Sequence, residues 1–135
     1  MKVVIDTNVL LVSISARSEA NWLWLALLLG EFDLYVTTDI LAEYEEIIGN
    51  EMGKAVAEAA LDLLSDLPNV YNVTKYYSWQ LVEQDPDDNK FVDCAIAAGA
   101  EYLVSEDKHL KIIQKYPYFN INLVKLAEFK IVLGK

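Results

Sequence analysis

The sequence contains very little cysteine or histidine. Its 135 residues include one cysteine, Cys94, and one histidine, His109. A disulfide framework, a CxxC zinc or redox motif and a site with two histidines are therefore excluded. The sequence also has no GxSxG motif, which argues against a serine hydrolase built around His109. Any catalysis by this chain is expected to depend on carboxylates.

Basic residues are scarce as well. The chain has 11 Lys and Arg against 21 Asp and Glu, a formal net charge of −10 at pH 7. Proteins that bind nucleic acid through bulk positive charge show the opposite balance. The excess of acid must therefore be either a solvated surface or a cluster that binds cations.

The chain lacks long apolar runs and is poor in glycine and proline. Five Gly and three Pro exclude a collagenous or linker-dominated chain. The longest apolar run, Trp22–Leu29, has eight residues, whereas a membrane span needs about 20. The apolar run at the start is too short for a signal peptide. We expect a cytoplasmic protein without a membrane segment.

What the sequence does contain is an alternation of short apolar runs and helical patterns. This pattern, in a chain with 54% hydrophobic residues, predicts a single domain over residues 1–135 with an α/β fold. We expect a three-layer α/β/α sandwich whose central, mostly parallel sheet has about five strands. The expected strands are 3–5, 34–36, 70–73, 102–104 and 121–124. The expected helices are 8–15, 20–29, 39–48, 55–67, 90–98, 108–115 and 126–133.

Acidic residues follow several of these strands. Asp6 comes directly after the first strand and Asp107 after the fourth, while the helix 90–98 is preceded by Asp88 and carries Asp93. In a parallel sheet the carboxyl ends of the strands share one edge, where ligands bind. Carboxylates gathered there repel one another unless a cation lies between them. The pattern therefore predicts a Mg²⁺ or Mn²⁺ site that can activate water against a phosphodiester.

Each of these acids also has a structural interpretation. Asp6 could form an Asx-turn or cap the next helix, Asp87 or Asp88 is expected to cap a helix whether or not it binds metal, and Asp107 could cap the helix that starts near Lys108. Asp93 shares a helix face with Asn89, away from the apolar stripe. It is therefore either a solvent-facing acid or part of the edge.

The helix 39–48 offers three more acids. Glu43 and Glu45 flank its apolar stripe at equal angles, while Glu46 points away. Periodicity thus dismisses Glu46 and leaves the other two open.

Lysines near Asp107 are the best candidates for contacts to phosphates. Lys108, Lys111 and Lys115 fall on one face of the helix 108–115, either as a strip that guides phosphates or as a solvated face. Lys90 and Arg17 could add to such a strip.

Two apolar features suggest contacts with other molecules. Tyr76, Tyr77 and Trp79 lie in a loop and could stack unpaired bases, although packing over the core is the favoured interpretation. The Trp22–Leu29 helix is apolar all round, so we expect part of it to form an interface with a second copy of the chain or with a protein partner.

Four segments together resemble the PIN-domain family, in its toxin-like (VapC-like) branch. They are Val-Val-Ile-Asp-Thr-Asn-Val-Leu from residue 3, Leu-Ala-Glu-Tyr from residue 41, Asp-Pro-Asp-Asp-Asn-Lys-Phe-Val-Asp-Cys-Ala-Ile-Ala-Ala-Gly-Ala from residue 85 and Leu-Val-Ser-Glu-Asp-Lys-His-Leu from residue 103. The resemblance implies a PIN-like fold and a metal-dependent endoribonuclease, in many members the toxin of a toxin–antitoxin pair and in many a dimer.

The resemblance also implies roles for individual residues. Asp6 matches the first acid of the family and Glu43 the second. The third acid stands in some branches where Asp93 lies and in others where Asp88 lies, and this sequence has both. Asp107 matches the fourth acid.

Two polar residues match supporting positions of the same family. Ser105 corresponds to a small hydroxyl residue beside the site, and Asn8 to a polar residue that orients the first acid.

Two other functions fit the sequence less well. An aspartyl-phosphate phosphohydrolase also places an Asp after its first strand, but the second residue on is Asn8 where those enzymes use an acid. A non-catalytic PIN-like binding or regulatory module is the main alternative, and the complete set of acids argues against it.

Overall fold

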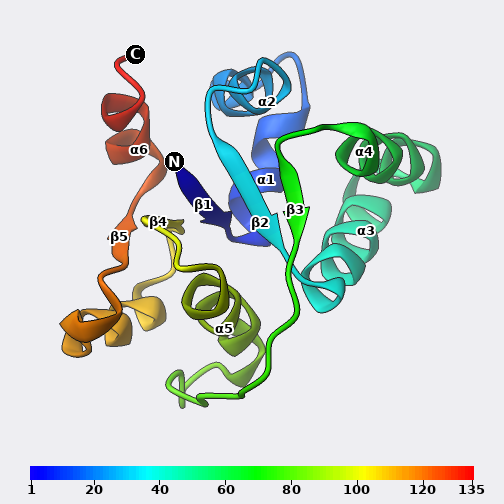
Figure 1. The fold of residues 1–135 in the computed structure, drawn as a ribbon. Helices are drawn as coiled ribbons and strands as arrows, with labels where there is room; N and C mark the ends of the chain where they lie inside the picture. Colours follow the sequence, from blue (N-terminus) through cyan, green and yellow to red (C-terminus); the bar gives the residue numbers. More distant parts are fainter.

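Five short strands form one parallel sheet at the centre of the molecule (Figure 1). The computed structural model describes residues 1–135. The strands are β1 (Lys2–Ile5), β2 (Asp33–Val36), β3 (Val70–Asn72), β4 (Tyr102–Val104) and β5 (Asn122–Val124). Their order is β3-β2-β1-β4-β5, and every neighbouring pair is parallel. The β-branched run of β1 is fully buried, as expected for a central strand covered on both faces.

Helices cover both faces of the sheet. In Figure 1, α5 lies below the strands and α1 and α2 lie on the other side of them, which confirms the three-layer α/β/α architecture. The α-helices are α1 (Thr7–Ile14), α2 (Asn21–Leu28), α3 (Thr38–Met52), α4 (Lys54–Asp66), α5 (Asn89–Ala98) and α6 (Leu126–Val132). Three 3₁₀ helices complete the fold: η1 (Pro86–Asp88), η2 (Lys108–Lys115) and η3 (Pro117–Phe119). None of the helices has the length and apolar character that crossing a membrane requires.

The third helix ends later than the sequence pattern indicated. The expected end at Ile48, before Gly49, is wrong: α3 continues to Met52 and ends at Gly53, which has φ 97°. Gly49 lies inside α3 against α4, where a Cβ would make an ordinary contact of 3.7 Å with the Cβ of Ala57. A φ of 97° cannot continue a helix, and residues with a side chain rarely adopt it. A glycine is therefore suited to end α3 at this position.

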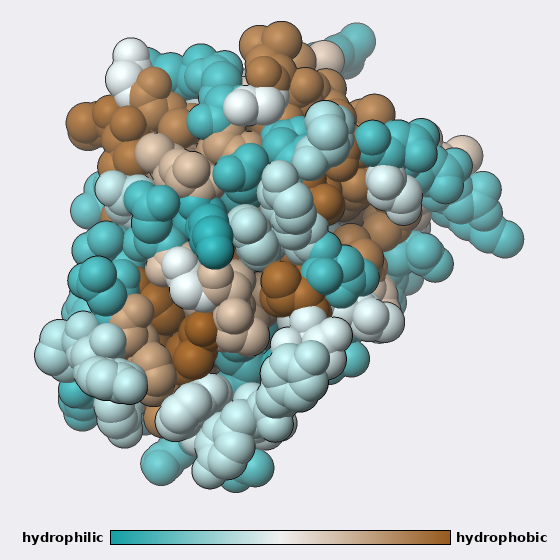
Figure 2. All heavy atoms as spheres, in the orientation of Figure 1, coloured by the Kyte–Doolittle hydropathy of each residue, from teal (hydrophilic) through white to brown (hydrophobic).

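The apolar helix α2 is mostly covered by its own chain. Leu23 and Leu27 are buried, and the ring of Phe129 from α6 lies 6.5 Å from the ring of Trp22. On the outer side Leu25 and Leu29 remain exposed. Brown surface over α2 and α6 is visible at the top of Figure 2. Only the outer strip of this helix is therefore open to another molecule.

The sheet changes its direction of winding between β1 and β4. From β1 the chain adds β2 and β3 on one side, and then crosses back to add β4 and β5 on the other. Ligands of open α/β sheets bind at the carboxyl ends of the strands beside such a switch point. Asp6 follows β1 and Ser105 follows β4, so both lie at this position.

Candidate active site

Asp6 is held at the switch point by the neighbouring strand. Its backbone N–H donates to the carbonyl of Val104 at 3.0 Å, and its Oδ2 accepts a hydrogen bond of 2.7 Å from the Ser105 hydroxyl. Burial raises the pKa of Asp6, as do the charges of Glu43 and Asp107, while the bond from Ser105 acts to lower it. The local environment thus disfavours a bare negative charge on Asp6 and would favour a nearby cation.

Glu43 of α3 reaches the same edge, and Glu45 does not. The hydroxyl of Thr7, the residue after Asp6, donates to Oε2 of Glu43, and Nζ of Lys90 lies 2.7 Å from Oε1. Glu45 is exposed. The choice that periodicity left open is thus decided by Thr7 and Lys90, which fix both oxygens of Glu43 beside Asp6.

Asp88 occupies the junction of η1 and α5, where it is 9% exposed. It stands at the N-cap position of α5, as expected, but its side chain makes no capping hydrogen bond. Its Oδ2 is buried and has no hydrogen-bond partner. Burial, together with Asp107, Asp6 and Asp85 nearby, raises the pKa of Asp88 to about 8. The pKa of Asp107 is lowered, by the neighbouring Asp88 carboxyl and by the bond from the His109 N–H.

Asn89 explains how Asp88 comes to face the edge. Its side chain accepts a bond of 2.8 Å from the Val82 N–H and donates one of 3.1 Å to the Val82 carbonyl. This pair of bonds closes the loop in front of η1 and fixes the start of α5. The side chain of Asn89 is therefore used for positioning, and its neighbour Asp88 is left to face the other acids.

Four residues form what we call the acidic cluster: Asp85, Asp88, Asp107 and His109. Each offers one ligand atom, and these atoms lie within 4.8 Å of one another. His109 Nδ1 lies 3.4 Å from Oδ1 of Asp107, without the alignment of a hydrogen bond. Carboxylate oxygens with one imidazole are suitable ligands for Mn²⁺ and, through the oxygens, for Mg²⁺. The unpartnered Oδ2 of Asp88 among other carboxylates is the feature that a bound cation would satisfy.

Asp107 also shapes the chain after β4. Its backbone N–H donates to the Ser105 hydroxyl at 2.9 Å, and its Oδ1 accepts 2.8 Å from the N–H of His109. The capping role expected for Asp107 is confirmed. Its second oxygen remains available to the acidic cluster.

Asp93 lies elsewhere, contrary to both expectations for it. It is 2% exposed, accepts a bond of 3.1 Å from the Trp79 N–H and lies 3.6 Å from Nζ of Lys75. It is neither a solvent-facing acid nor a member of the acidic cluster. Helical periodicity placed Asp93 correctly away from the apolar stripe, but it could not show what covers that side of α5.

Residues 73–84, which we call the strap, cover that side of α5. In Figure 1 the strap runs from β3 beneath α5.

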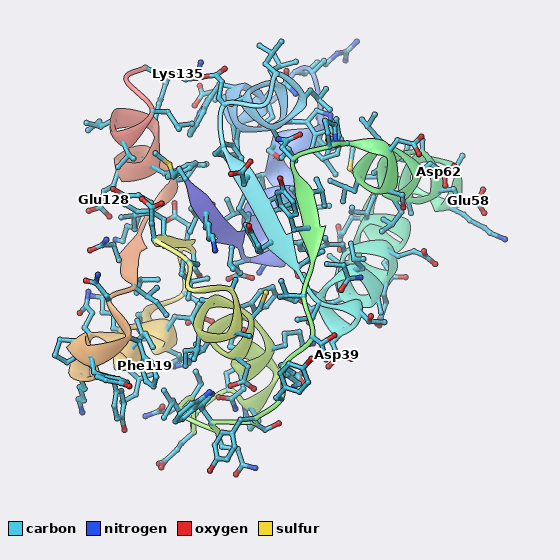
Figure 3. The ribbon with its side chains drawn as sticks, viewed as in Figure 1. Asp39, Glu58, Asp62, Phe119, Glu128 and Lys135 are labelled. Carbon is cyan, nitrogen blue, oxygen red and sulfur yellow. The ribbon has the colours of Figure 1, made fainter.

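A polar hollow of about 540 Å³ lies at this side of the molecule. Lys75 there bridges Asp93 and Asp39, the latter at 3.8 Å. Figure 3 labels Asp39 at the start of α3. Lys75 thus joins the strap to both α3 and α5. The strap has no helical or strand periodicity, so its sequence could not indicate these contacts.

The expected basic residues are divided between two roles. Lys90 is engaged with Glu43, so it is not a free contact for phosphates. Lys108, Lys111 and Lys115 line one hollow of about 370 Å³, and the expected short helix that carries them is the 3₁₀ helix η2. We call this the lysine hollow. Lys125, which no sequence pattern indicated, joins Lys108 and Lys111 in an adjacent hollow beside Asp107.

Asn8 acts on Asp6 through its backbone and not through its side chain. Its backbone N–H lowers the pKa of Asp6, while its side chain is exposed. The side-chain bonds come from Ser105, which donates to Asp6, and from Thr7, which donates to Glu43. The sequence did not indicate a role for Thr7. Neighbouring residues at the start of a helix point in different directions, so Thr7 faces the site while Asn8 faces solvent. Ser105 contacts Asp6 as expected, and Asp88 and Asp107 belong to the acidic cluster. The ligand roles of Asp6, Glu43, Asp88 and Asp107 stay predictions.

Comparison with known proteins identifies the family of the fold. The family model described as "PIN domain" matches residues 2–109. The chain belongs to the PIN domain family. The match covers β1 through the start of η2 and includes every acid described above, while Lys111, Lys115 and Lys125 lie beyond it.

Among solved structures, this PIN domain is similar to a chain in the crystal structure of VapBC2 from Rickettsia felis bound to a DNA fragment from their promoter. The TM-score is 0.60 at 22% identity, over 93% of this chain and 98% of that chain. At this identity the likeness concerns the fold. No curated protein matches the sequence significantly.

Proposed function

We propose that this PIN domain is a Mg²⁺- or Mn²⁺-dependent endoribonuclease, acting as one nuclease domain over residues 1–135. The observation that carries the proposal is the buried, unpartnered Oδ2 of Asp88 beside Asp107 and Asp6 at the switch point. Carboxylates this close are stable when they share a proton or a cation. Membership of the PIN domain family supports a nuclease.

Each acid then has a defined task. Asp6, Asp88 and Asp107 hold the cation, with Asp85 and His109 beside them. When bound, such an ion lowers the pKa of a water and stabilises the charge that develops on the phosphodiester. Ser105 orients Asp6 through its 2.7 Å hydrogen bond.

Glu43 contributes a further carboxylate in a fixed orientation. Thr7 and Lys90 each hold one of its oxygens, so this side chain keeps its place without a bound metal. Lys90 also places a positive charge close to where a phosphate would enter.

Cleavage of a single-stranded RNA in Mn²⁺ tests the proposal. We expect cleavage with 5′-phosphate and 3′-hydroxyl ends, none in EDTA, and none by Asp6→Asn, because a carboxamide is an uncharged and poorer ligand. Asp62→Asn is the matched control: Asp62 is exposed on α4, an element that carries none of the acids of the site, and is labelled in Figure 3. Full activity in EDTA, or in Asp6→Asn, would contradict the mechanism. Absence of both Mn²⁺ binding and cleavage would instead favour a non-catalytic module.

We further propose that the protein is a cytoplasmic toxin that pairs with an antitoxin protein and forms a homodimer. The fold likeness to a chain of the VapBC2 complex supports an antitoxin partner, and exposed Leu25 and Leu29 on α2 support a further interface. Multi-angle light scattering of the wild type and of Leu25→Lys tests the dimer. A wild-type monomer at micromolar concentration would rule it out.

A further inference from the structure

The exposed large apolar side chains of this protein separate by chemical type. The aliphatic ones, which lie on the N-terminus, α1, α2 and α6, are Met1, Val12, Leu25, Leu29 and Ile131. The aromatic ones are Tyr71, Tyr76, Tyr77, Trp79, Tyr116 and Tyr118. All the aromatic ones except Tyr71 belong to the strap or to the residues around η3. The prediction that Tyr76 and Tyr77 pack over the core is therefore wrong, since these residues are 93% and 65% exposed.

Five rings from the strap and η3 touch one another, and we call them the aromatic cluster. Phe119 is at its centre, with ring centroids 5.0 Å from Trp79, 5.4 Å from Tyr118 and 6.3 Å from Tyr116. Tyr77 lies 4.7 Å from Trp79 on the other side. Phe119 is labelled in Figure 3, and pale surface of intermediate hydropathy extends along the lower side of Figure 2. The half-buried Phe119 supports rings whose outer faces remain open to solvent.

The backbone under these rings is fixed by Asp93. Its bond from the Trp79 N–H and its ion pair with Lys75 fasten the strap to α5. Asp93 therefore has a structural role that does not involve metal: it holds the backbone of Trp79, whose ring contacts Phe119. A ring held in advance loses less conformational entropy when a ligand stacks on it.

Positive charge connects the aromatic cluster with the acidic cluster. Lys115 immediately precedes Tyr116 and lines the lysine hollow, together with Lys108 and Lys111. His109 lines the same hollow and belongs to the acidic cluster. A shared residue thus links the acids to the lysines, and a peptide bond links the lysines to the aromatic rings.

We propose that the aromatic cluster is a stacking platform for unpaired bases of a single-stranded RNA whose phosphates contact the lysine hollow; this rests on the proposed ribonuclease function. Base–aromatic stacking combined with a basic groove is how proteins hold single strands without reading sequence. Adjacent lysines complement phosphates, whereas the exposed aliphatic side chains better suited to a protein partner lie on other elements. The net charge of −10 is compatible with this, because the contact depends on a local arrangement.

Binding of hexauridylate in EDTA, followed by fluorescence anisotropy, tests this platform without cleavage. We expect Trp79→Ala and Tyr118→Ala each to weaken binding by about fivefold to a hundredfold, and Trp79→Phe to stay within about twofold because it keeps a ring. Tyr71→Ala is the matched control, since Tyr71 stacks on Tyr35 at the edge of the sheet, apart from the cluster. An abasic strand of equal length should bind as weakly as the alanine variants.

The basic part of the platform has its own measurement. Lys115→Gln should reduce the slope of log Kd against log salt concentration by about 0.7, the value for one phosphate contact on a single strand. Tyr118 is 89% exposed, so its alanine variant will fold even if Trp79→Ala does not.

Several results would overturn the platform. They are undetectable binding by the wild type, equal affinity for the abasic strand, and unchanged affinity of Tyr118→Ala. Loss of self-association or of a protein partner with RNA binding intact would assign the rings to a protein interface instead. Failure of the nuclease proposal is distinguishable, because it would leave ring-dependent binding in EDTA but no cleavage in Mn²⁺. Cleavage with ring-independent binding would refute only the platform.

Discussion

The Ser105 hydroxyl connects Asp6 to Asp107 across the two central strands. It donates to Oδ2 of Asp6 at 2.7 Å and accepts from the backbone N–H of Asp107 at 2.9 Å. The Ser105 hydroxyl thus acts as a donor to one acid of the site and as an acceptor from the backbone of another. Since Ser105 is itself buried, water cannot readily replace it in this arrangement.

Ser105→Ala should therefore weaken the metal site while leaving every acid in place. Without its hydroxyl donor the pKa of Asp6 rises further, and Asp6 can rotate. We expect Mn²⁺ affinity, measured by isothermal titration calorimetry, to fall about 10- to 100-fold, as for other partners of metal ligands. Ser13→Ala is the control, since it also removes a buried hydroxyl, one that bonds the carbonyl of Leu10. An equal loss in both variants would show a general packing effect.

Asp88 and Asp93 should respond oppositely to the same substitution. Asp88→Asn removes a carboxylate from the acidic cluster, so Mn²⁺ binding and cleavage should be lost while the fold remains. Asp93→Asn removes the charge opposite Lys75 but keeps an oxygen for the Trp79 N–H. It should retain Mn²⁺ affinity within about twofold and lose roughly 1–2 kcal/mol of stability in urea unfolding. The reverse result would place the third metal ligand at Asp93.

The metal-free protein should lose stability as the pH rises. In the folded state the pKa of Asp88 is raised from 3.8 to about 8, so between these values the native state holds a proton that the unfolded chain has released. Stability is then complete near pH 4 and is lost as the pH approaches 8. The raised pKa of Asp6 acts in the same direction. The melting temperature in EDTA should fall over this range.

Two variants separate this effect from general charge repulsion. Asp88→Asn should flatten the dependence, whereas Asp62→Asn, with the same change in charge at an exposed site, should leave it unchanged. Saturating Mn²⁺ should also remove it in the wild type. A melting temperature that rises between pH 5 and pH 8 in EDTA would contradict the assignment.

Local sequence patterns were sufficient for the sheet and for two of the acids. The β-branched run at Val3–Ile5 could only be a buried strand, and parallel-strand geometry then required Asp6 and Asp107 to meet at one edge. No pattern in α3 distinguished Glu43 from Glu45, because the difference lies in Thr7 and Lys90, which approach from other elements.

The strap shows the physical limit of such reasoning. It has no helical or strand periodicity, so its path over α5 follows from contacts such as Lys75 with Asp93 rather than from its own sequence. Periodicity assigns a residue to a helix face but does not show what covers that face. The burial of Asp93 and the exposure of Tyr76 and Tyr77 were misjudged for this one reason.

Glu43 and Glu45 provide the last test, because they differ in orientation within one helical turn. Glu43→Gln keeps an oxygen for Thr7 but loses the charge that holds Lys90 at 2.7 Å. We expect the rate of RNA cleavage in Mn²⁺ to fall roughly 10- to 100-fold, with stability changed by less than about 1 kcal/mol because the ion pair is partly exposed. Glu45→Gln makes the same change in charge at an exposed position of α3 and should cleave at the wild-type rate. Equal rates for the two variants would remove Glu43 from the site, whereas a selective loss in Glu43→Gln would show that its orientation matters beyond the net charge of the helix.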